Sequence, residues 1–264
     1  MVERDLDPDH ATEEFWRNFL THGDPNERRI RRVFRRLPHG PRCKLCAAPF
    51  AGLAAPVMRA IGKRPSDKNP TMCTSCFDFM AKHHGGAEID CSFLFADVRG
   101  STAMAERMSP AEFRGMLDRF YVLATTLVID HDGSIDKFVG DELVAMYMPL
   151  LSGERHTEHA VDTARALLRA TGHADAGGPW LPLGAGVHTG RAWVGAVGDG
   201  TRTELTALGD TVNTTARLAS VARAGEILVS AAAAAAAELD PGLERRSLDL
   251  KGKANPTEAF VVRV

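Results

Sequence analysis

Two pairs of cysteines constrain how the first third of this 264-residue chain can fold. Cys43 and Cys46 form one Cys-x-x-Cys pair, Cys73 and Cys76 form the other, and 26 residues separate the pairs. Each pair can offer two sulfurs from a tight turn, and two pairs complete a tetrahedral site for zinc. The intervening residues include four prolines and two glycines and should have little regular core of their own. We therefore predict a zinc-ribbon-like segment over residues 41–84 with one structural Zn²⁺ per chain.

Other uses of these cysteines remain open at this point. An iron–sulfur cluster or a thiol switch shares the paired spacing. His83 and His84 lie close enough in sequence to be spare ligands, although surface positions suit them better. Cys91 lies in an apolar run and is interpreted as a small core residue.

Charge and composition indicate which partners and which cellular compartment to expect. The net charge of −2 gives no global attraction to nucleic acid or to an anionic membrane. No apolar run approaches the ~20 residues that span a bilayer. The N-terminal "MVERDLDPDH" is acidic and lacks the apolar stretch of a signal peptide. We therefore expect a cytoplasmic protein whose cysteines are thiols or metal ligands rather than disulfides.

The N-terminal region, residues 1–40, is expected to be helical over 12–37. Its sequence "ERRIRRVFRRL" places four apolar residues on one helical face, namely Ile30, Val33, Phe34 and Leu37. Six arginines cover the rest, namely Arg28, Arg29, Arg31, Arg32, Arg35 and Arg36. An amphipathic helix docked on its own protein is the simplest interpretation. A regulatory partner or a membrane surface are the alternatives, and sparse aromatic residues make nucleic acid a weaker one.

Residues 88–264 read as one α+β domain. A strand over 89–96 is followed by a helix that begins at the capping box "SPAE" and runs to about 129. Hairpins are expected at "SIDKFVGDELVAMYM" and at "LPLGAGVHTGRAWVGAVG", with helices over about 156–171 and 211–222. The strand "EILVS", an alanine-rich helix and two strands follow. This order predicts one sheet with helices packed on one face.

Polar residues interrupt this pattern at three places. Asp97 ends the apolar run in "FLFADVRGST", and Asp141 lies at the tip of the first hairpin in "DKFVGDELVAMY". If their strands are neighbours, the two carboxylates meet at one edge and suit magnesium, although each could simply be a turn residue. In "TALGDTVNTTARL", Asn213 and Arg217 share a helical face and suit a sugar and a phosphate, or solvent. Asp210 is expected to be the N-cap of that helix.

Taken together, these motifs resemble a known family. The stretches "FLFADVRGST", "DKFVGDELVAMY", "GVHTGRAWVGAVG", "TALGDTVNTTARLAS" and "LKGK", in this order, resemble the class III adenylyl/guanylyl cyclase catalytic domain over about residues 88–264. The resemblance implies a ferredoxin-like α+β fold and head-to-tail homodimers with active sites at the interface.

The resemblance also implies roles for individual residues. Asp97 and Asp141 match the aspartates that hold two Mg²⁺ or Mn²⁺ ions per site, and Val98 would add a backbone carbonyl. The amides of Gly100, Ser101 and Thr102 would receive phosphate oxygens. In the catalytic helix, Asn213 matches the residue that orients the ribose, and Arg217 the one that stabilises charge on the α-phosphate. Lys251 or Lys253 would reach the terminal phosphates, without the motif settling which.

Two further positions concern the base. Lys137 matches the lysine that donates to the adenine ring in ATP-using members, where guanylyl cyclases usually have glutamate. Thr206 matches the partner position, which is often aspartate. A threonine hydroxyl can accept from the exocyclic amine of adenine but can also donate, which weakens discrimination between purines.

The resemblance thus implies an adenylate cyclase. The ribose 3′-hydroxyl of ATP would attack the α-phosphate in line with two-metal assistance, giving 3′,5′-cyclic AMP and pyrophosphate. A guanylate cyclase and a catalytically silent cyclase-like regulatory module are the alternatives. A zinc-ribbon nucleic-acid binder with the large domain as a sensor is less favoured.

Overall fold

The structure is a computed structural model that describes residues 8–23, 25–37, 40–198, 203–253 and 255–264. The chain forms two compact units, Met1–Ile89 with Ala192–Leu208, and Asp90–Arg191 with Gly209–Val264. The first seven residues of the acidic start "MVERDLDPDH", which argued against a signal peptide, lie outside the described residues. The division into regions 1–40, 41–84 and 88–264 stays a prediction.

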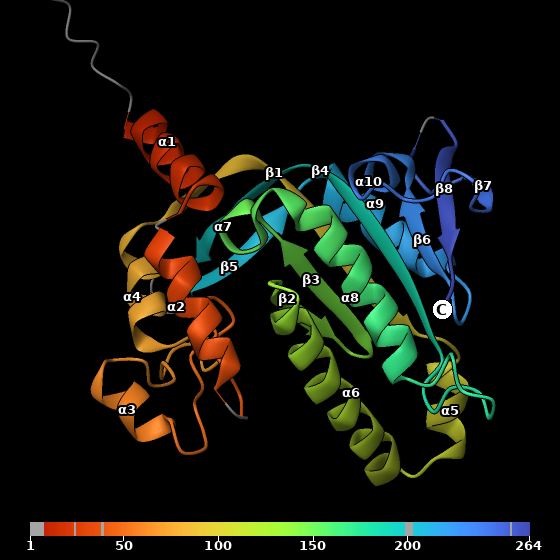
Figure 1. Cartoon of the computed structure of the whole chain (residues 1–264), viewed down its shortest axis with the longest axis horizontal. Helices are drawn as coiled ribbons and strands as arrows, with labels where there is room; N and C mark the ends of the chain where they lie inside the picture. Colours follow the sequence, from red (N-terminus) through yellow and green to blue (C-terminus); the bar gives the residue numbers. More distant parts are fainter. Residues whose placement is uncertain (1–7, 24, 38–39, 199–202, 254) are drawn as a thin grey trace, which may run out of the picture. The chain divides into compact units, whose positions relative to one another are not determined.

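The helices and strands follow one another in an order close to the predicted one (Figure 1). The N-terminal elements are α1 Pro8–Thr21, α2 Pro25–Arg36, α3 Ala55–Ala60 and α4 Thr74–Lys82. Those that follow are β1 Gly85–Val98, α5 Ser101–Arg107, α6 Pro110–Asp130, β2 Ser134–Val139, β3 Glu142–Tyr147, α7 Pro149–Ser152, η1 Gly153–Arg155 and α8 His156–Ala170. The last are β4 Leu183–Gly198, β5 Thr203–Leu208, α9 Asp210–Val221, β6 Ile227–Ser230, α10 Ala231–Ala236, β7 Arg245–Leu248 and β8 Thr257–Val262.

The strands described form one sheet in the order β2-β3-β1-β4-β6-β8-β7, with β5 paired to β4. β1 and β3 are antiparallel neighbours, so that Asp97 lies opposite Glu142. The order β1, α6, β2, β3, α8, β4 is the predicted strand–helix–strand–strand–helix–strand pattern, and the α+β prediction is confirmed. Among the described residues, no helix combines the length and apolar character needed to cross a membrane.

Two apolar cores show which face each helix covers. The larger core joins α6 and α8 to the sheet, and α6 lies against α8 (Figure 1). Ile227 and Val229 of β6 point into this core, whereas Leu228 between them packs with Leu218 of α9 in a second core. Because strand side chains alternate between faces, α9 covers the face opposite α6 and α8. The prediction that the helices share one face was wrong for α9.

Local sequence signals place α6 as predicted. The Ser109 hydroxyl accepts a hydrogen bond from the Glu112 amide at 3.3 Å, and the Glu112 carboxylate accepts one from the Ser109 amide at 2.8 Å. This capping box satisfies two donors at the helix start, with Pro110 at the first helical position.

The predicted second hairpin is wrong. Residues 183–198 form the single strand β4, whose first part pairs in parallel with β6 and whose last part pairs antiparallel with β5. Gly190 lies in the middle of the stretch predicted as a hairpin, but it serves close packing in the strand, because a Cβ there would lie 3.1 Å from the hydroxyl of Thr211. The chain reverses instead between β4 and β5.

The predicted N-terminal helix is two helices, and the docked face of α2 differs from the expected one. Phe34 is buried as predicted, whereas Ile30 and Val33 are exposed. Arg31 is buried instead, because its guanidinium donates to the backbone carbonyls of Lys44 and Leu45. The helix is therefore anchored to the first cysteine pair by an arginine–carbonyl contact as well as by apolar packing.

A network of ion pairs near the β7–β8 edge of the sheet joins Glu226 to Arg246 and Arg263. Glu226 is only 4% exposed, and its carboxylate accepts two hydrogen bonds from Arg246, at 2.7 and 2.8 Å, and one from Arg263 at 2.8 Å. The hydrogen bonds from Arg246 and Arg263 outweigh burial and lower the pKa of Glu226 to about 2. An unfolded glutamate has a pKa of about 4.3, so the ionised network favours the folded state by about 3 kcal/mol.

This network predicts acid sensitivity. The contribution is fully present above the unfolded pKa and is lost as the pH falls through about 4 toward about 2. Glu226→Gln should therefore cost about 3 kcal/mol of unfolding free energy at neutral pH, and the difference from wild type should shrink as the pH approaches about 3. Urea unfolding at several pH values measures this. Glu258→Gln is the matched control, since its pair with Arg245 is half-exposed and should contribute under about 1 kcal/mol. Equal effects of the two variants would contradict the assignment.

Candidate active site

Two predicted metal ligands meet at the edge of β1 and β3. Asp97 lies in β1 opposite Glu142, and Asp141 immediately precedes Glu142 in the β2–β3 turn. Tyr121 of α6 fixes this turn, since its hydroxyl donates to the Gly140 carbonyl and its ring stacks on Phe138 with centroids 4.0 Å apart. The structure thus brings Asp97 and Asp141 together, as the sequence predicted for neighbouring strands.

The electrostatics of this edge indicate surplus negative charge. Burial raises the pKa of Asp97, with Arg99 opposing and Asp141 adding to the shift. Burial, helped by Asp97 and Asp141, raises the pKa of Glu142 to about 7, again against Arg99. Oδ2 of Asp141 is buried and has no hydrogen-bond partner in the described part of the chain. Buried carboxylate oxygens without a partner are costly, so this edge favours a bound cation.

Arg99 was not predicted as a site residue. Its Nη2 lies 3.3 Å from Oδ2 of Asp97, and it donates to the carbonyls of Ala219 and Ser220 at 2.6 and 3.2 Å. One side chain therefore ties the end of β1 to the last turn of α9. The signal was available in "DVRGST", where an arginine follows the aspartate by two residues.

The predicted phosphate loop follows directly. Gly100 precedes α5 with φ of 74°, a left-handed conformation that favours glycine, and a Cβ there would meet nothing within 4 Å. The amides of Ser101 and Thr102 belong to the first turn of α5, where backbone donors lack helical acceptors. Val98 is buried, and its amide hydrogen-bonds to the Asp97 carboxylate.

The residues predicted to bind ribose and α-phosphate lie on α9. Asn213 is exposed and Arg217 is half-buried, one helical turn apart. The N-cap of α9 is Gly209 rather than the predicted Asp210. Asp210 is the first helical residue, and its side chain forms an ion pair with Lys253 instead.

The "LKGK" turn packs against this helix. Gly252 has φ of 78°, and a Cβ there would lie 3.3 Å from Nη2 of Arg217. Lys253 is 25% exposed and paired with Asp210, whereas Lys251 is exposed. The two candidate phosphate-binding lysines therefore differ in their surroundings, since Lys253 contacts the start of α9 and Lys251 is exposed.

The base-reading candidates lie on two strands. Lys137 in β2 is 53% exposed, with Nζ 3.3 Å from the carboxylate of Asp136. Thr206 in β5 is half-buried and pairs with Gly195 of β4. Lys137 belongs to the larger unit and Thr206 to the smaller one.

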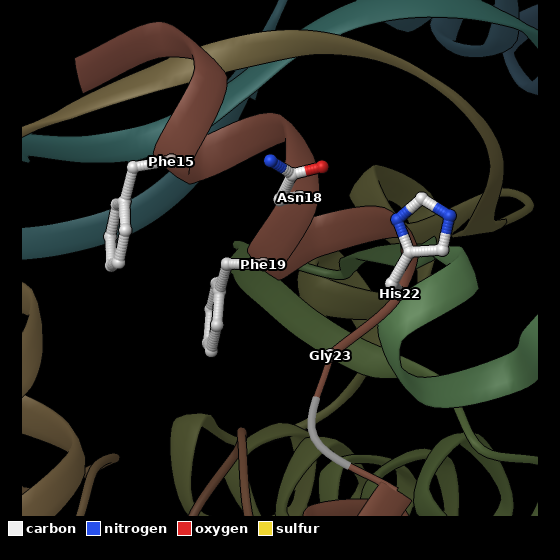
Figure 2. A pocket seen from close by; sticks show the side chains of 5 residues that line it. All are labelled: Phe15, Asn18, Phe19, His22 and Gly23. Carbon is white, nitrogen blue, oxygen red and sulfur yellow. The ribbon is translucent and has the colours of Figure 1, made fainter. Parts of the chain in front are cut away.

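No hydrogen bond or ion pair in the described residues joins Asp97 or Asp141 to Asn213 or Arg217. Surface hollows lie elsewhere in sequence. Figure 2 shows one along α1, where Phe15 and Phe19 project to one side of the helix. A second is lined by residues of α5 and α6 that include Phe113 and Tyr121.

The four predicted zinc ligands do converge. The sulfurs of Cys43, Cys46, Cys73 and Cys76 all lie within 4.8 Å of one another. Cys46 and Cys73 have sulfurs 3.7 Å apart, which matches the edge of about 3.8 Å expected for a tetrahedron with Zn–S bonds of about 2.3 Å. The Cys73 amide donates to the Cys43 sulfur at 3.3 Å. Cys91 is buried, as predicted.

The pKa values of the four hydrogen-bonded cysteines are also consistent with a metal site. Burial raises the pKa of the Cys43 thiol, but hydrogen bonds from Cys46, Cys73 and Cys76 outweigh it and lower the pKa well below the ordinary value. Hydrogen bonds with Cys43, Cys46 and Cys73 raise the pKa of Cys76. A buried thiolate beside three more sulfurs is the donor set that a Zn²⁺ ion would occupy.

Comparisons with known proteins agree with this fold. The sequence profile of the Adenylate and Guanylate cyclase catalytic domain matches residues 86–263. Adenylate cyclase 1 of Rhizobium meliloti (strain 1021) is 33% identical in an alignment of 191 residues, which covers 68% of this chain and 29% of that protein. Adenylate cyclase of Anabaena cylindrica is 30% identical in an alignment of 138 residues, which covers 48% of this chain and 26% of that one. The chain thus spans less than a third of the length of these relatives.

Solved structures are similar too. The guanylyl cyclase Cya2 superposes with a TM-score of 0.60 and 27% identity, covering 67% of this chain and 93% of that one. The adenylyl cyclase CyaB from P. aeruginosa gives a TM-score of 0.59 and 26% identity, covering 68% of this chain and 97% of that one. The fold is therefore that of class III cyclases.

The cysteine cluster predicts metal-dependent folding of its segment. Purified protein should contain about one zinc per chain, and Cys73→Ser should lose it and loosen residues 41–84 while the larger unit stays folded. Elemental analysis and amide hydrogen exchange measure the two effects. Cys91→Ala is the matched control and should keep its zinc. Protein that contains no zinc, or iron with sulfide, would contradict this prediction.

Proposed function

Because the chain belongs to the adenylate and guanylate cyclase catalytic domain family, we propose that it is an adenylate cyclase, which converts ATP to 3′,5′-cyclic AMP and pyrophosphate. The observation that carries this proposal is the meeting of Asp97 and Asp141 at the β1–β3 edge, with a buried carboxylate oxygen of Asp141 that has no partner among the described residues. A domain that had lost catalysis would have little reason to keep this uncompensated charge.

The donor set at this edge fits Mg²⁺ or Mn²⁺, which prefer carboxylate and carbonyl oxygens. Asp97 and Asp141 would hold the ions, with the carbonyl of Val98 as a further ligand. When bound, such ions supply charge that favours deprotonation of the ribose 3′-hydroxyl and stabilises the leaving pyrophosphate.

The remaining residues would bind and orient the nucleotide. The amides of Gly100, Ser101 and Thr102 would receive phosphate oxygens, and Lys251 or Lys253 would add positive charge. Lys253 pairs with Asp210, whereas the side chain of Lys251 is exposed, so Lys251 is the lysine that could bind phosphate without displacing Asp210. Asn213 would orient the ribose, and Arg217 would donate to the α-phosphate as negative charge accumulates there.

The choice of ATP rests on Lys137 and Thr206. A lysine ammonium donates to the unprotonated N1 of adenine, whereas guanine presents an N–H at that position, which an ammonium cannot bind. Two relatives bear the name adenylate cyclase, and Cya2 bears the name guanylyl cyclase. A guanylate cyclase is therefore the second candidate.

A site shared between two chains is also proposed. The resemblance assigns Asp97 and Asp141 to one protomer of a head-to-tail homodimer, and Lys137, Thr206, Asn213 and Arg217 to the other. The four-cysteine cluster is proposed to hold one structural Zn²⁺.

Substrate choice gives a direct test. Wild-type protein with Mg²⁺ or Mn²⁺ should form cyclic AMP from ATP and turn over GTP poorly. Lys137→Glu should lower kcat/KM for ATP by about 10- to 100-fold, because one charged donor to the base is lost. Arg114→Glu, at a side chain of α6 that is 82% exposed, is the matched charge-reversal control and should be unaffected. A wild-type preference for GTP would refute the assignment.

Mixed dimers test the shared site. Asp97→Ala and Arg217→Ala homodimers should each be nearly inactive, since each change damages both sites of a two-fold dimer. In a mixed dimer, the intact aspartates of the Arg217→Ala chain meet the intact arginine of the Asp97→Ala chain, so one of the two sites is complete. Free exchange makes about half of the dimers mixed, so about a quarter of wild-type activity should return.

The matched control for this experiment pairs two variants from the same half of the site. Chains with Asp97→Ala and Asp141→Ala cannot build a whole site together and should restore nothing. Different tags on the two chains would verify that mixed dimers form. Verified Asp97→Ala/Arg217→Ala dimers without recovered activity would argue that each chain builds its own site.

A further inference from the structure

The strand that carries Thr206 belongs to the same compact unit as the cysteine segment. This unit contains residues up to Ile89 together with Ala192–Leu208, which is the end of β4 and all of β5. Helix α4, which begins right after Cys73, lies against β5. The position and direction of β5 are therefore determined inside this unit.

Lys44 makes the first specific contact with β5. It lies between Cys43 and Cys46, and its side chain is only 7% exposed. Its ammonium donates to the carboxylate of Glu204 at 3.2 Å and to the carbonyl of Leu205 at 3.4 Å. Burying an ammonium is costly, so these acceptors fix where the chain of β5 can lie.

Asn69 makes the second contact. It is 4% exposed, and its amide nitrogen donates to the carbonyl of Thr203 at 3.2 Å. Its side-chain oxygen accepts from the amide and the hydroxyl of Thr71, at 3.1 and 2.6 Å. The carbonyl of Thr71 in turn accepts from the amide of Lys44 at 2.9 Å. Thr71 therefore links Asn69 to Lys44, because it donates to the side chain of Asn69 and accepts from the backbone amide of Lys44.

Three successive residues, Thr203, Glu204 and Leu205, are held in this way. The side chains of Thr203, Leu205 and Ala207 are buried, whereas those of Glu204 and Thr206 lie on the other face and are half-buried. Because side chains alternate along a strand, fixing residues 203–205 fixes the face on which the next side chain, that of Thr206, is presented.

We propose that Lys44 and Asn69 are specificity-determining positioning residues, which clamp β5 to the cysteine segment and so aim the hydroxyl of Thr206 at the purine base. This rests on the proposed function, in which Thr206 reads the exocyclic group of the base. The residues touch no substrate themselves and act only through β5.

The primary test compares nucleotide preference in Lys44→Met and Asn69→Ala with wild type. Each variant should lower the ratio of kcat/KM for ATP to that for GTP by about threefold to tenfold, the effect of one buried hydrogen bond. Zinc content should stay unchanged. Lys82→Met, an exposed lysine at the end of α4, is the matched control and should leave the ratio unchanged.

A second background separates positioning from general loss of structure. In Thr206→Ala protein the base-reading hydroxyl is absent, so adding Lys44→Met should not lower the ratio further. Amide hydrogen exchange provides a reading without activity, since residues 204–207 should exchange faster in both clamp variants than in Lys82→Met.

The proposal is overturned if both clamp variants bind zinc normally and keep the wild-type ATP:GTP ratio, or if Lys44→Met lowers the ratio equally with and without Thr206. Should Lys44→Met lose zinc, Asn69→Ala decides the question, because it lies outside both cysteine pairs. Wild-type protein that forms no cyclic nucleotide would instead refute the proposed function, and faster exchange of β5 in the variants would still identify the clamp.

Discussion

The antiparallel pairing of β1 with β3 is the constraint on which the larger unit depends. This register places Asp97 opposite Glu142 and next to Asp141, so that carboxylates gather where they are partly removed from water. Such a cluster is unfavourable unless cations or protons neutralise it. Arg99 supplies one positive charge, and the raised pKa values of Asp97 and Glu142 show that it does not suffice. Arg99 also reaches the last turn of α9, so the same side chain ties the carboxylate edge to the helix that carries Asn213 and Arg217.

The sequence predicted those features that depend on neighbouring residues. The Ser109–Glu112 capping box, the β2–β3 hairpin and the α+β order were all encoded locally, and the structure confirms them. The single strand β4 was missed because a glycine within a strand and a glycine in a turn look alike until the packing partner, here Thr211, is known. The N-cap of α9 was missed for a similar reason, because Asp210 is drawn to Lys253, a residue far along the chain.

In the candidate sites too, the sequence predicted local features and missed contacts between distant residues. Cysteine spacing was enough to predict that four sulfurs converge, because each pair is fixed by a short turn. Nothing in the spacing indicated that Lys44, inside the first pair, would turn its ammonium toward β5, or that Arg31 rather than Ile30 would be buried on α2. Buried cations find their acceptors among distant backbone carbonyls, and those carbonyls have no sequence signature.

The turn after β7 lies beside two residues of α9, Arg217 and Asp210. Gly252 leaves room for the guanidinium of Arg217, since any side chain there would approach it within 3.3 Å. Next to it, Lys253 pairs with Asp210, and the pKa of the nearby His188 falls to about 4 through burial and, secondarily, the charge of Lys253. His188 is therefore neutral near pH 7 and adds no further positive charge beside Lys253. A triphosphate that engaged Lys253 would first have to displace Asp210, whereas Lys251 is exposed on the same turn. The turn therefore places Gly252 beside Arg217 and pairs Lys253 with Asp210 of α9. Under the proposed function, Lys251 is the lysine that would meet the terminal phosphates without displacing Asp210.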